Sequence, residues 1–214
     1  MSDQRKHDTS PKRSVPHNPI SYTVGISTIY RARLKGSIFY LYVFLDIFSR
    51  KIVGWQVYAE ESSQNASDVI QDICQRERIG HHLVVLHSDN GSSMKGATML
   101  AMLQTLGIMP SLSRPAVSND NPYSESAFKT LKYRPDYPLR PFADLTAARD
   151  WAEKLVQWYN HEHRHSGIQF VSPAQRHDGL DRDIIKKAIS GLCRRTTSTT
   201  AALLWQGAQL AVCG

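Results

Sequence analysis

Two acidic residues lie where a metal-dependent reaction could use them. Asp89 follows a short apolar run, Leu83 to Leu86, and Glu125 opens a predicted helix, with 35 residues between the two acids. Brought together at one end of a sheet, such carboxylates supply hard oxygen ligands for Mg²⁺ or Mn²⁺ and leave room for a phosphate. The alternative interpretation is that Asp89 only begins a turn and that Glu125 is a first-turn residue favoured by the helix dipole.

Basic residues follow the second acid at helical spacing. Lys129 and Lys132 come four and seven positions after Glu125, so all three share one face of the predicted helix, and Arg134 extends the basic stretch. The whole chain carries 26 Lys and Arg against 19 Asp and Glu, a net charge of +7 with a pI near 9.4. This balance favours a polyanionic partner, with nucleic acid first. The alternatives are an ordinary surface pair of Glu125 with Lys129 and a basic surface that serves only solubility.

An alternation of strand and helix patterns must position these residues. Ile38–Asp46 is a nearly continuous β-branched and aromatic run, which predicts a central strand buried on both faces. Ile52–Tyr58 predicts its hairpin partner across the polar turn at 49–51. Apolar periodicity and breakers predict further helices at Ser63–Ile79, Met99–Leu106, from about Ser124 and at Thr146–His161, and short strands at Leu83–Leu86 and Ile108–Leu112.

Composition limits the class of protein. A chain of 214 residues with 41% hydrophobic and 21% charged residues suits one folded domain, not a disordered or fibrous chain. No apolar run is long enough for a membrane span and the start has no signal-peptide pattern, so we expect a cytoplasmic protein without a membrane partner. Three widely spaced cysteines favour neither a disulfide framework nor a zinc site.

Several motifs together resemble the integrase catalytic core of bacterial insertion-sequence transposases. The resemblance covers about residues 28–180, and the spacing of Asp89 and Glu125 is similar to that of the family's second and third acids. The segments that carry it are Tyr40–Val43, Leu45–Trp55, His87–Gly91, Ser118–Ser126, Phe128–Pro135, Trp158–Asn160, His165–Gly167 and Ser172–Gln175.

The resemblance implies an α/β, ribonuclease-H-like fold with a mixed five-stranded sheet and helices on both faces. It also implies three acids that bind two Mg²⁺ ions, or Mn²⁺, and phosphoryl transfer on DNA, with element ends and target DNA as partners. Asp89 and Glu125 would be catalytic residues and metal ligands. Lys129, Lys132 and Arg134 would bind nucleic acid, while Asp46 matches a position expected to be structural.

The first acid of the family is missing from this sequence. The family places it on the first strand in a Trp-Asp-Ile-Thr stretch, where this chain has Val24 to Thr28, so that Gly25 or Ile26 stands at the aspartate's position. No carboxylate occurs between Asp8 and Asp46. We therefore expect weakened metal binding and a protein that is inactive or barely active.

Both ends of the chain are candidates for a shifted reading frame. Back-translation of Asn18–Ser27 from the third base of each codon permits a text ending in Ser-Trp-Asp-Ile, and Ala202–Cys213 from the second base permits one ending in Arg-Asn-Trp, like the family's usual end. This hypothesis divides the chain into a basic N-terminal segment, 1–27, a core, 28–180, and a non-native tail, 181–214. The alternative is that Gly25 is a genuine substitution and the tail a genuine extension.

Three functions are compatible with these patterns. The first is a transposase or integrase-like protein of DNA transposition whose catalysis is impaired by the incomplete acid triad. The second is a non-enzymatic remnant that binds DNA, or that pairs with itself or with an intact transposase and inhibits it. The third and weakest is a ribonuclease-H-like nuclease, which would need a third acid that the sequence does not provide.

Overall fold

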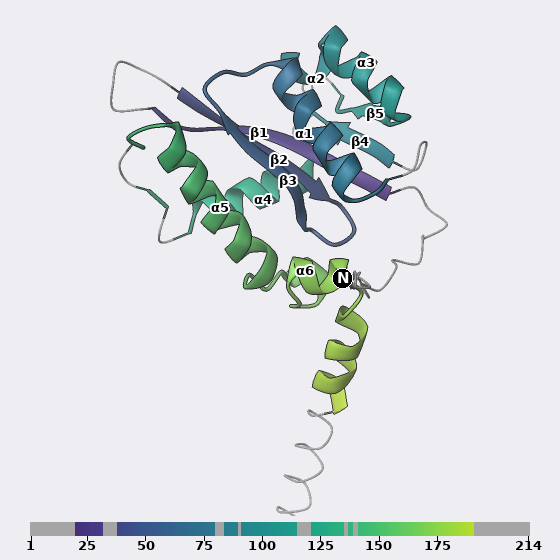
Figure 1. Ribbon diagram of the computed structural model, residues 1–214. Helices are drawn as coiled ribbons and strands as arrows, with labels where there is room; N and C mark the ends of the chain where they lie inside the picture. The colour runs from purple at the N-terminus through teal and green to yellow at the C-terminus, as the bar shows by residue number, and fades with distance from the viewer. Residues whose placement is uncertain are drawn as a thin grey trace, which may run out of the picture.

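The computed structural model describes residues 20–31, 38–79, 84–89, 91–114, 121–134, 137–138 and 141–190, the first of these ranges by its backbone alone (Figure 1). The strands are β1 (Ile20–Arg31), β2 (Ile38–Asp46), β3 (Ile52–Tyr58), β4 (Val84–Ser88) and β5 (Met109–Leu112). The helices are α1 (Ser63–Arg76), α2 (Ser92–Lys95), α3 (Ala97–Leu106), α4 (Pro122–Lys132), α5 (Leu145–His161), the 3₁₀ turn η2 (Ser166–Ile168) and α6 (Pro173–His177).

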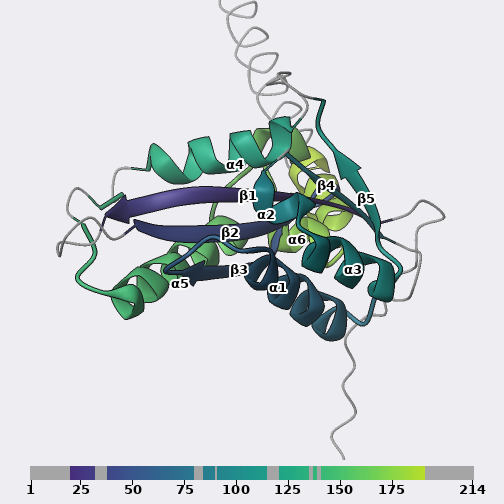
Figure 2. The same cartoon turned by 90° about the horizontal axis from the view of Figure 1, so that it is seen from above.

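The strands form one mixed sheet in the order β3-β2-β1-β4-β5. β1 pairs antiparallel with β2, and β2 with β3, whereas β4 runs parallel to both β1 and β5. The antiparallel hairpin of β2 and β3 is the one predicted from the sequence. β1 therefore joins the antiparallel half of the sheet to the parallel half, and Figure 2 shows α4 running along it.

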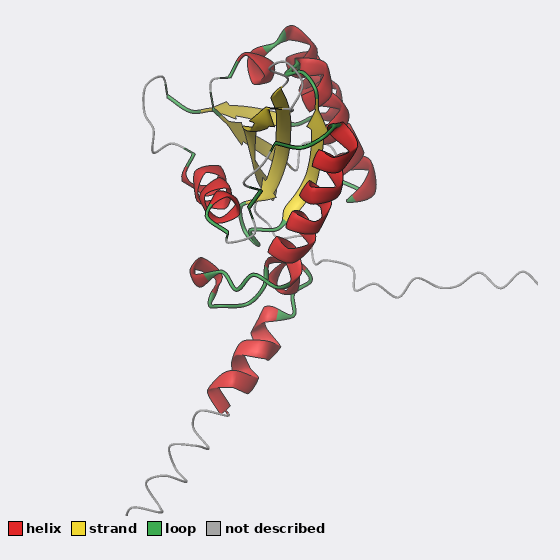
Figure 3. Cartoon of the chain, turned by 90° about the vertical axis from the view of Figure 1, so that its left-hand side faces the viewer, coloured by secondary structure: helices red, strands yellow, loops and turns green. Residues whose placement is uncertain are grey.

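Strand β2 faces hydrophobic cores on both sides of the sheet. Tyr42 and Phe44 pack with α1 and α3, while Leu41, Val43 and Leu45 pack with α4 and α5. Burial on both faces explains why this strand reads as a continuous apolar run rather than an alternating one. The result is a three-layer α/β domain, with the strands between helices in Figure 3.

Strand β1 lies in the middle of the sheet, next to β2, which is the interior strand buried on both faces that the sequence predicted. β1 begins at Ile20, so residues 20–27 of the predicted N-terminal segment belong to a strand. The sequence ISYTVGISTIYR did not indicate this strand clearly, because small and polar residues interrupt its apolar pattern. Residues 1–19 and 191–214 lie outside the described residues. They make up most of the two segments, 1–27 and 181–214, in which a shifted reading frame was suspected.

The helices match their predicted positions with shifts at the ends. α1 ends at Arg76, earlier than predicted, because Glu77 caps it and Arg78 adopts a positive φ of 51°. Residues 181–190 are helical, although the sequence pattern had been expected to decay after Leu180. In the described part of the chain, no helix is both long and apolar enough to cross a membrane.

Both edges of the sheet carry features that block further strand pairing. At the β3 edge, the side-chain amide of Asn160 accepts from Ile52 N at 2.9 Å and donates to Ile52 O at 3.0 Å, as a neighbouring strand would. The Arg149 side chain donates to Val57 O at 3.1 Å. At the opposite edge, Pro110 in β5 has no backbone N–H to offer.

Candidate active site at the end of β4 and the start of α4

The end of β4 is fixed by hydrogen bonds to the end of β5. Ser88 O accepts from Ser113 N at 2.9 Å and from Ser113 Oγ at 3.1 Å, and His87 Nδ1 lies 3.0 Å from Ser111 Oγ. These bonds hold the backbone immediately before Asp89. The Asp89 side chain is exposed, and its Oδ1 accepts from Gly91 N at 3.2 Å. Asp89 thus makes the turn contact of the alternative interpretation and still presents its carboxylate to solvent.

Helix α4 presents Glu125 from its first turn. Ser124, Ala127 and Leu131 form the buried side of this helix, and Ala127 and Leu131 belong to the core beneath β2. The helix contacts β1 and β2. Glu125 is exposed and makes no ion pair with any residue that the structure describes, so its carboxylate is available to a ligand.

The strand register brings Gly25, one of the two positions where the first acid was expected, beside Asp89. β1 and β4 are parallel, with Val24 opposite Ser88, so that Gly25 is the next position along β1 as Asp89 is along β4. On its other side Gly25 is paired with Val43 of β2. Gly25, rather than Ile26, is therefore level with Asp89. The sequence alone had left these two positions open.

The acids at this site suit a divalent cation but supply only two carboxylates. Asp89 and Glu125 offer hard oxygen donors that Mg²⁺ and Mn²⁺ prefer. Within the described ranges, no three His, Cys, Asp or Glu side chains come together in a way that could hold a metal ion. The residues present thus offer two carboxylates with the chemistry that a divalent cation needs, and Gly25, level with Asp89, has no side chain that could add a donor.

The predicted basic residues divide into two kinds. Lys129 and Lys132 are exposed on the same side of α4 as Glu125, and no ion pair joins Lys129 to Glu125. Arg134 is instead half-buried, with its guanidinium 4.1 Å from the centre of the Trp158 ring of α5. A guanidinium stacked on an aromatic ring contributes to packing between helices. Of the three basic residues, Lys129 and Lys132 are thus the ones with side chains exposed to solvent.

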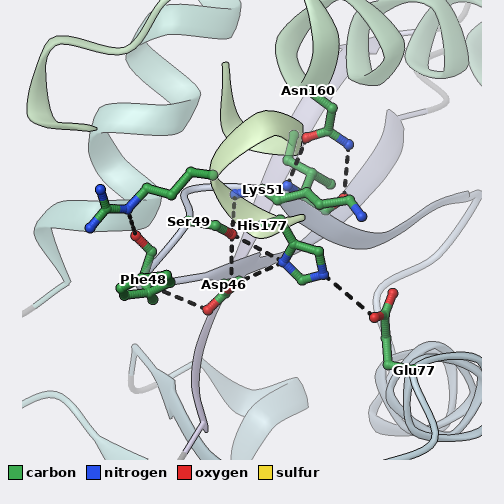
Figure 4. Close-up of polar contacts among 9 residues, drawn as sticks. Asp46, Phe48, Ser49, Lys51, Glu77, Asn160 and His177 are labelled. Carbon is green, nitrogen blue, oxygen red and sulfur yellow. Dashed lines mark hydrogen bonds and ion pairs between the residues drawn. The ribbon is translucent and has the colours of Figure 1, made fainter. Parts of the chain in front are cut away.

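A buried polar network lies at the turn between β2 and β3 (Figure 4). Asp46, 1% exposed, accepts from Ser49 Oγ at 2.6 Å and from Phe48 N at 3.2 Å. His177 of α6 places Nδ1 3.2 Å from Asp46 Oδ2 and Nε2 3.6 Å from Glu77 Oε2. The network ties α6 and the end of α1 to the turn. Asp46 therefore has the structural role expected from the sequence.

This network is not a hydrolytic triad, although it contains Ser, His and Asp. Ser49 is fully buried and its hydroxyl donates to Asp46, while His177 Nδ1 faces both of these side chains. A nucleophilic serine needs access to substrate and a histidine nitrogen that accepts its proton. No sequence pattern indicated that His177 or Glu77 takes part, because they lie 131 and 31 positions from Asp46.

Glu77 should make stability sensitive to acid. Its close polar contact with the His177 ring holds the pKa of this carboxyl below its ordinary value, with burial opposing the effect. A depressed carboxyl pKa contributes stability above the ordinary range and loses it as pH falls through the folded value. We expect the melting temperature to decrease as the pH is lowered below about 4.5, and to decrease less in Glu77→Gln. Thermal melts between pH 6 and pH 3 check this, with Glu153→Gln on the exposed side of α5 as control. An equal pH slope in wild type and Glu77→Gln would contradict it.

The comparison with known proteins identifies the family. Two family models, both described as integrase core domain, match residues 26–118 and 106–173, a range that includes most of the sheet and the helices α1 to α5. The chain belongs to the integrase core domain family. This assignment confirms the resemblance found in the sequence motifs.

The integrase core domain is similar to transposases of insertion sequences. It is 31% identical over 139 residues to the transposase for insertion sequence element IS904 of Lactococcus lactis, covering 65% of this chain and 54% of the relative. It is 28% identical over 137 residues to the putative transposase for IS986/IS6110 of Mycobacterium tuberculosis, covering 61% and 48%. The chain thus spans about half the length of the curated relatives it matches.

Solved integrase structures share the fold. The catalytic core of BIV integrase matches with a TM-score of 0.51 at 18% identity, covering 79% of this chain and 99% of the other. A chain of the simian T-cell lymphotropic virus intasome, solved with PP2A regulatory subunit B56 gamma, matches with a TM-score of 0.57 at 18% identity, covering 74% and 54%. At this identity the likeness establishes the α/β fold of the integrase core.

Proposed function

We propose that this integrase core domain is the catalytic region of an insertion-sequence transposase that acts on DNA and is impaired in catalysis. The observation that supports the proposal is the strand register, which makes Gly25 on β1 level with Asp89 after β4, while α4, the helix that carries Glu125, contacts β1. Two of the three retain a carboxylate. The third has no side chain, so the site lacks a donor where metal-dependent phosphoryl transfer would need one.

The residues have separate roles in this proposal. Asp89 and Glu125 would hold Mg²⁺ or Mn²⁺, which supplies Lewis acidity to a phosphodiester when it is bound. Lys129 and Lys132 would contact DNA phosphates from the exposed face of α4, giving affinity that does not depend on sequence and that falls with salt. Partners are then the element ends and target DNA.

Metal binding tests the proposal. We expect Mn²⁺ to bind the wild-type chain weakly and the double variant Asp89→Asn, Glu125→Gln at least about tenfold more weakly, because both charged donors are lost. Titration followed by the electron paramagnetic resonance signal of free Mn²⁺ measures this. The control is Asp72→Asn, Glu153→Gln, which removes two exposed acids from α1 and α5. Equal Mn²⁺ affinity in wild type and the Asp89, Glu125 variant would refute the proposed site.

A second function is favoured by the incomplete acid set. A chain with only two carboxylates at the site could bind DNA, or pair with itself or an intact transposase, without catalysis of its own. DNA binding that persists in excess chelator and in the Asp89→Asn, Glu125→Gln variant, together with absence of nicking, would favour this non-enzymatic role. Loss of DNA binding on chelation would favour the metal-dependent one.

A further inference from the structure

Arg50 occupies an unfavourable environment close to the candidate site. It lies in the turn between β2 and β3 with a φ of +65°, in the left-handed region that side chains other than glycine rarely adopt. Its Nε and NH1 atoms are buried and have no hydrogen-bond partner among the residues that the structure describes. Buried donors of a cation without acceptors are rare in proteins and cost stability. Residues in such unfavourable conformations are concentrated at functional sites.

The partner of Arg50 is an aromatic ring at the start of α4. The guanidinium carbon lies 3.9 Å from the centre of the Tyr123 ring, close enough for a direct cation–π contact. Tyr123 is the second residue of α4 and Glu125 the fourth, so both belong to the helix's first turn. The contact thus joins the turn between β2 and β3 to the turn of helix that carries Glu125.

One side of this contact is held by several hydrogen bonds. The turn between β2 and β3 is fixed by the Asp46 network and by the bonds Arg50 N to Asp46 O at 2.8 Å and Asp46 N to Lys51 O at 2.9 Å. At the start of α4, Asn121 makes no side-chain capping bond to the helix. The ring contact with Arg50 therefore links this first helical turn to a firmly held part of the fold.

We infer that Arg50 is a positioning residue for Glu125: its guanidinium, stacked on Tyr123, fixes the first turn of α4 against the turn between β2 and β3. The role assigned to Glu125 rests on the proposed function, whereas the ordering of the helix turn does not. In this role Arg50 acts on Glu125 through the Tyr123 ring and the helix turn. Burial raises the pKa of Tyr159 in α5 to about 12, and the positive charge of Arg50 opposes this rise.

Amide hydrogen exchange tests the ordering directly. Glu125 N donates to Asn121 O at 3.3 Å, and the following amides continue the helix. We expect Arg50→Met and Tyr123→Leu each to speed exchange of the amides of residues 125–128 by about tenfold with a nearly unchanged melting temperature, while Tyr123→Phe, which keeps the ring, exchanges like wild type. Wild-type exchange at 125–128 in both Arg50→Met and Tyr123→Leu would overturn the inference. Should Arg50→Met fail to fold, Tyr123→Leu decides alone, because this side chain is 36% exposed.

The same turn offers a matched control. Arg176 of α6 stacks on Phe48, with 4.5 Å between the guanidinium carbon and the ring centre, and does not contact α4 through this ring. Arg176→Met should leave exchange at 125–128 unchanged. Mn²⁺ titration of the same variants separates the two proposals. Faster exchange with about tenfold weaker Mn²⁺ binding supports both, whereas faster exchange in a chain that binds no Mn²⁺ at Glu125 supports the positioning role and refutes the metal site.

Discussion

Replacing Gly25 with aspartate is expected to raise Mg²⁺-dependent nicking of DNA by about a hundredfold or more. The reason is geometric: the register of β1 with β4 brings Gly25 level with Asp89, so the new carboxylate would join the two acids already present. Glycine removes the donor without disturbing the backbone pairing to Val43. Conversion of supercoiled plasmid to the nicked circle, with and without Mg²⁺, measures the gain.

Two variants control for charge and position. Gly25→Asn adds a neutral side chain of the same shape and should give little nicking. Ile26→Asp adds the charge one residue further, and successive strand residues face opposite sides of a sheet, so it should also give little. Equal nicking by Gly25→Asp and the unmodified chain would contradict the proposed site. Accurate nucleotide sequencing of the locus tests the related frame-shift hypothesis, which predicts Trp-Asp-Ile in a shifted frame.

Removing the Asp46 carboxylate should produce the largest loss of stability. Asp46→Ala leaves Ser49 Oγ, Phe48 N and the His177 ring without their shared acceptor in an interior position. Breaking a buried pair by removing one partner typically costs about 3–5 kcal/mol. Urea unfolding followed by circular dichroism would show a large fall in the midpoint.

An exposed ion pair in α1 gives the contrast. Asp72 pairs with Arg76 at 2.9 Å, but their side chains are 64% and 52% exposed. Asp72→Ala should cost only about 0.5 kcal/mol, since solvent screens such pairs. A midpoint for Asp46→Ala close to that of Asp72→Ala would show that the Asp46 network does not hold α6 and the turn together.

The sequence predicted the elements with strong patterns and missed the one with a weak pattern. β2 and α5 were evident because an apolar run and a helical periodicity mark them. β1 was divided at residue 27 because Ser21, Thr23 and Gly25 dilute its pattern, yet pairing on both sides places it at the centre of the sheet. The position of β1 is determined by its pairing with strands that are distant in sequence, and a short stretch of sequence carries no information about that pairing.

The candidate site was predicted only in part for a similar reason. Asp89 and Glu125 stood out because one follows a buried strand and the other opens a helix. Only the strand register shows that Gly25, and not Ile26, is level with Asp89, and the contact of Arg50 with Tyr123 joins residues 73 positions apart. Arg134 was grouped with the lysines by proximity in sequence, whereas its contact with Trp158 depends on how α4 and α5 pack.

The closed edges of the sheet bear on how copies of this domain can associate. Strands at open edges recruit strands from other molecules and lead to aggregates or domain-swapped chains. Here the Asn160 amide occupies the hydrogen-bonding groups of Ile52 at one edge, and Pro110 interrupts the donors at the other. The sheet is therefore a poor template for intermolecular β-pairing. Self-association of this fold is left to the outer surfaces of its helices, where side chains and not backbone groups determine which molecules fit together.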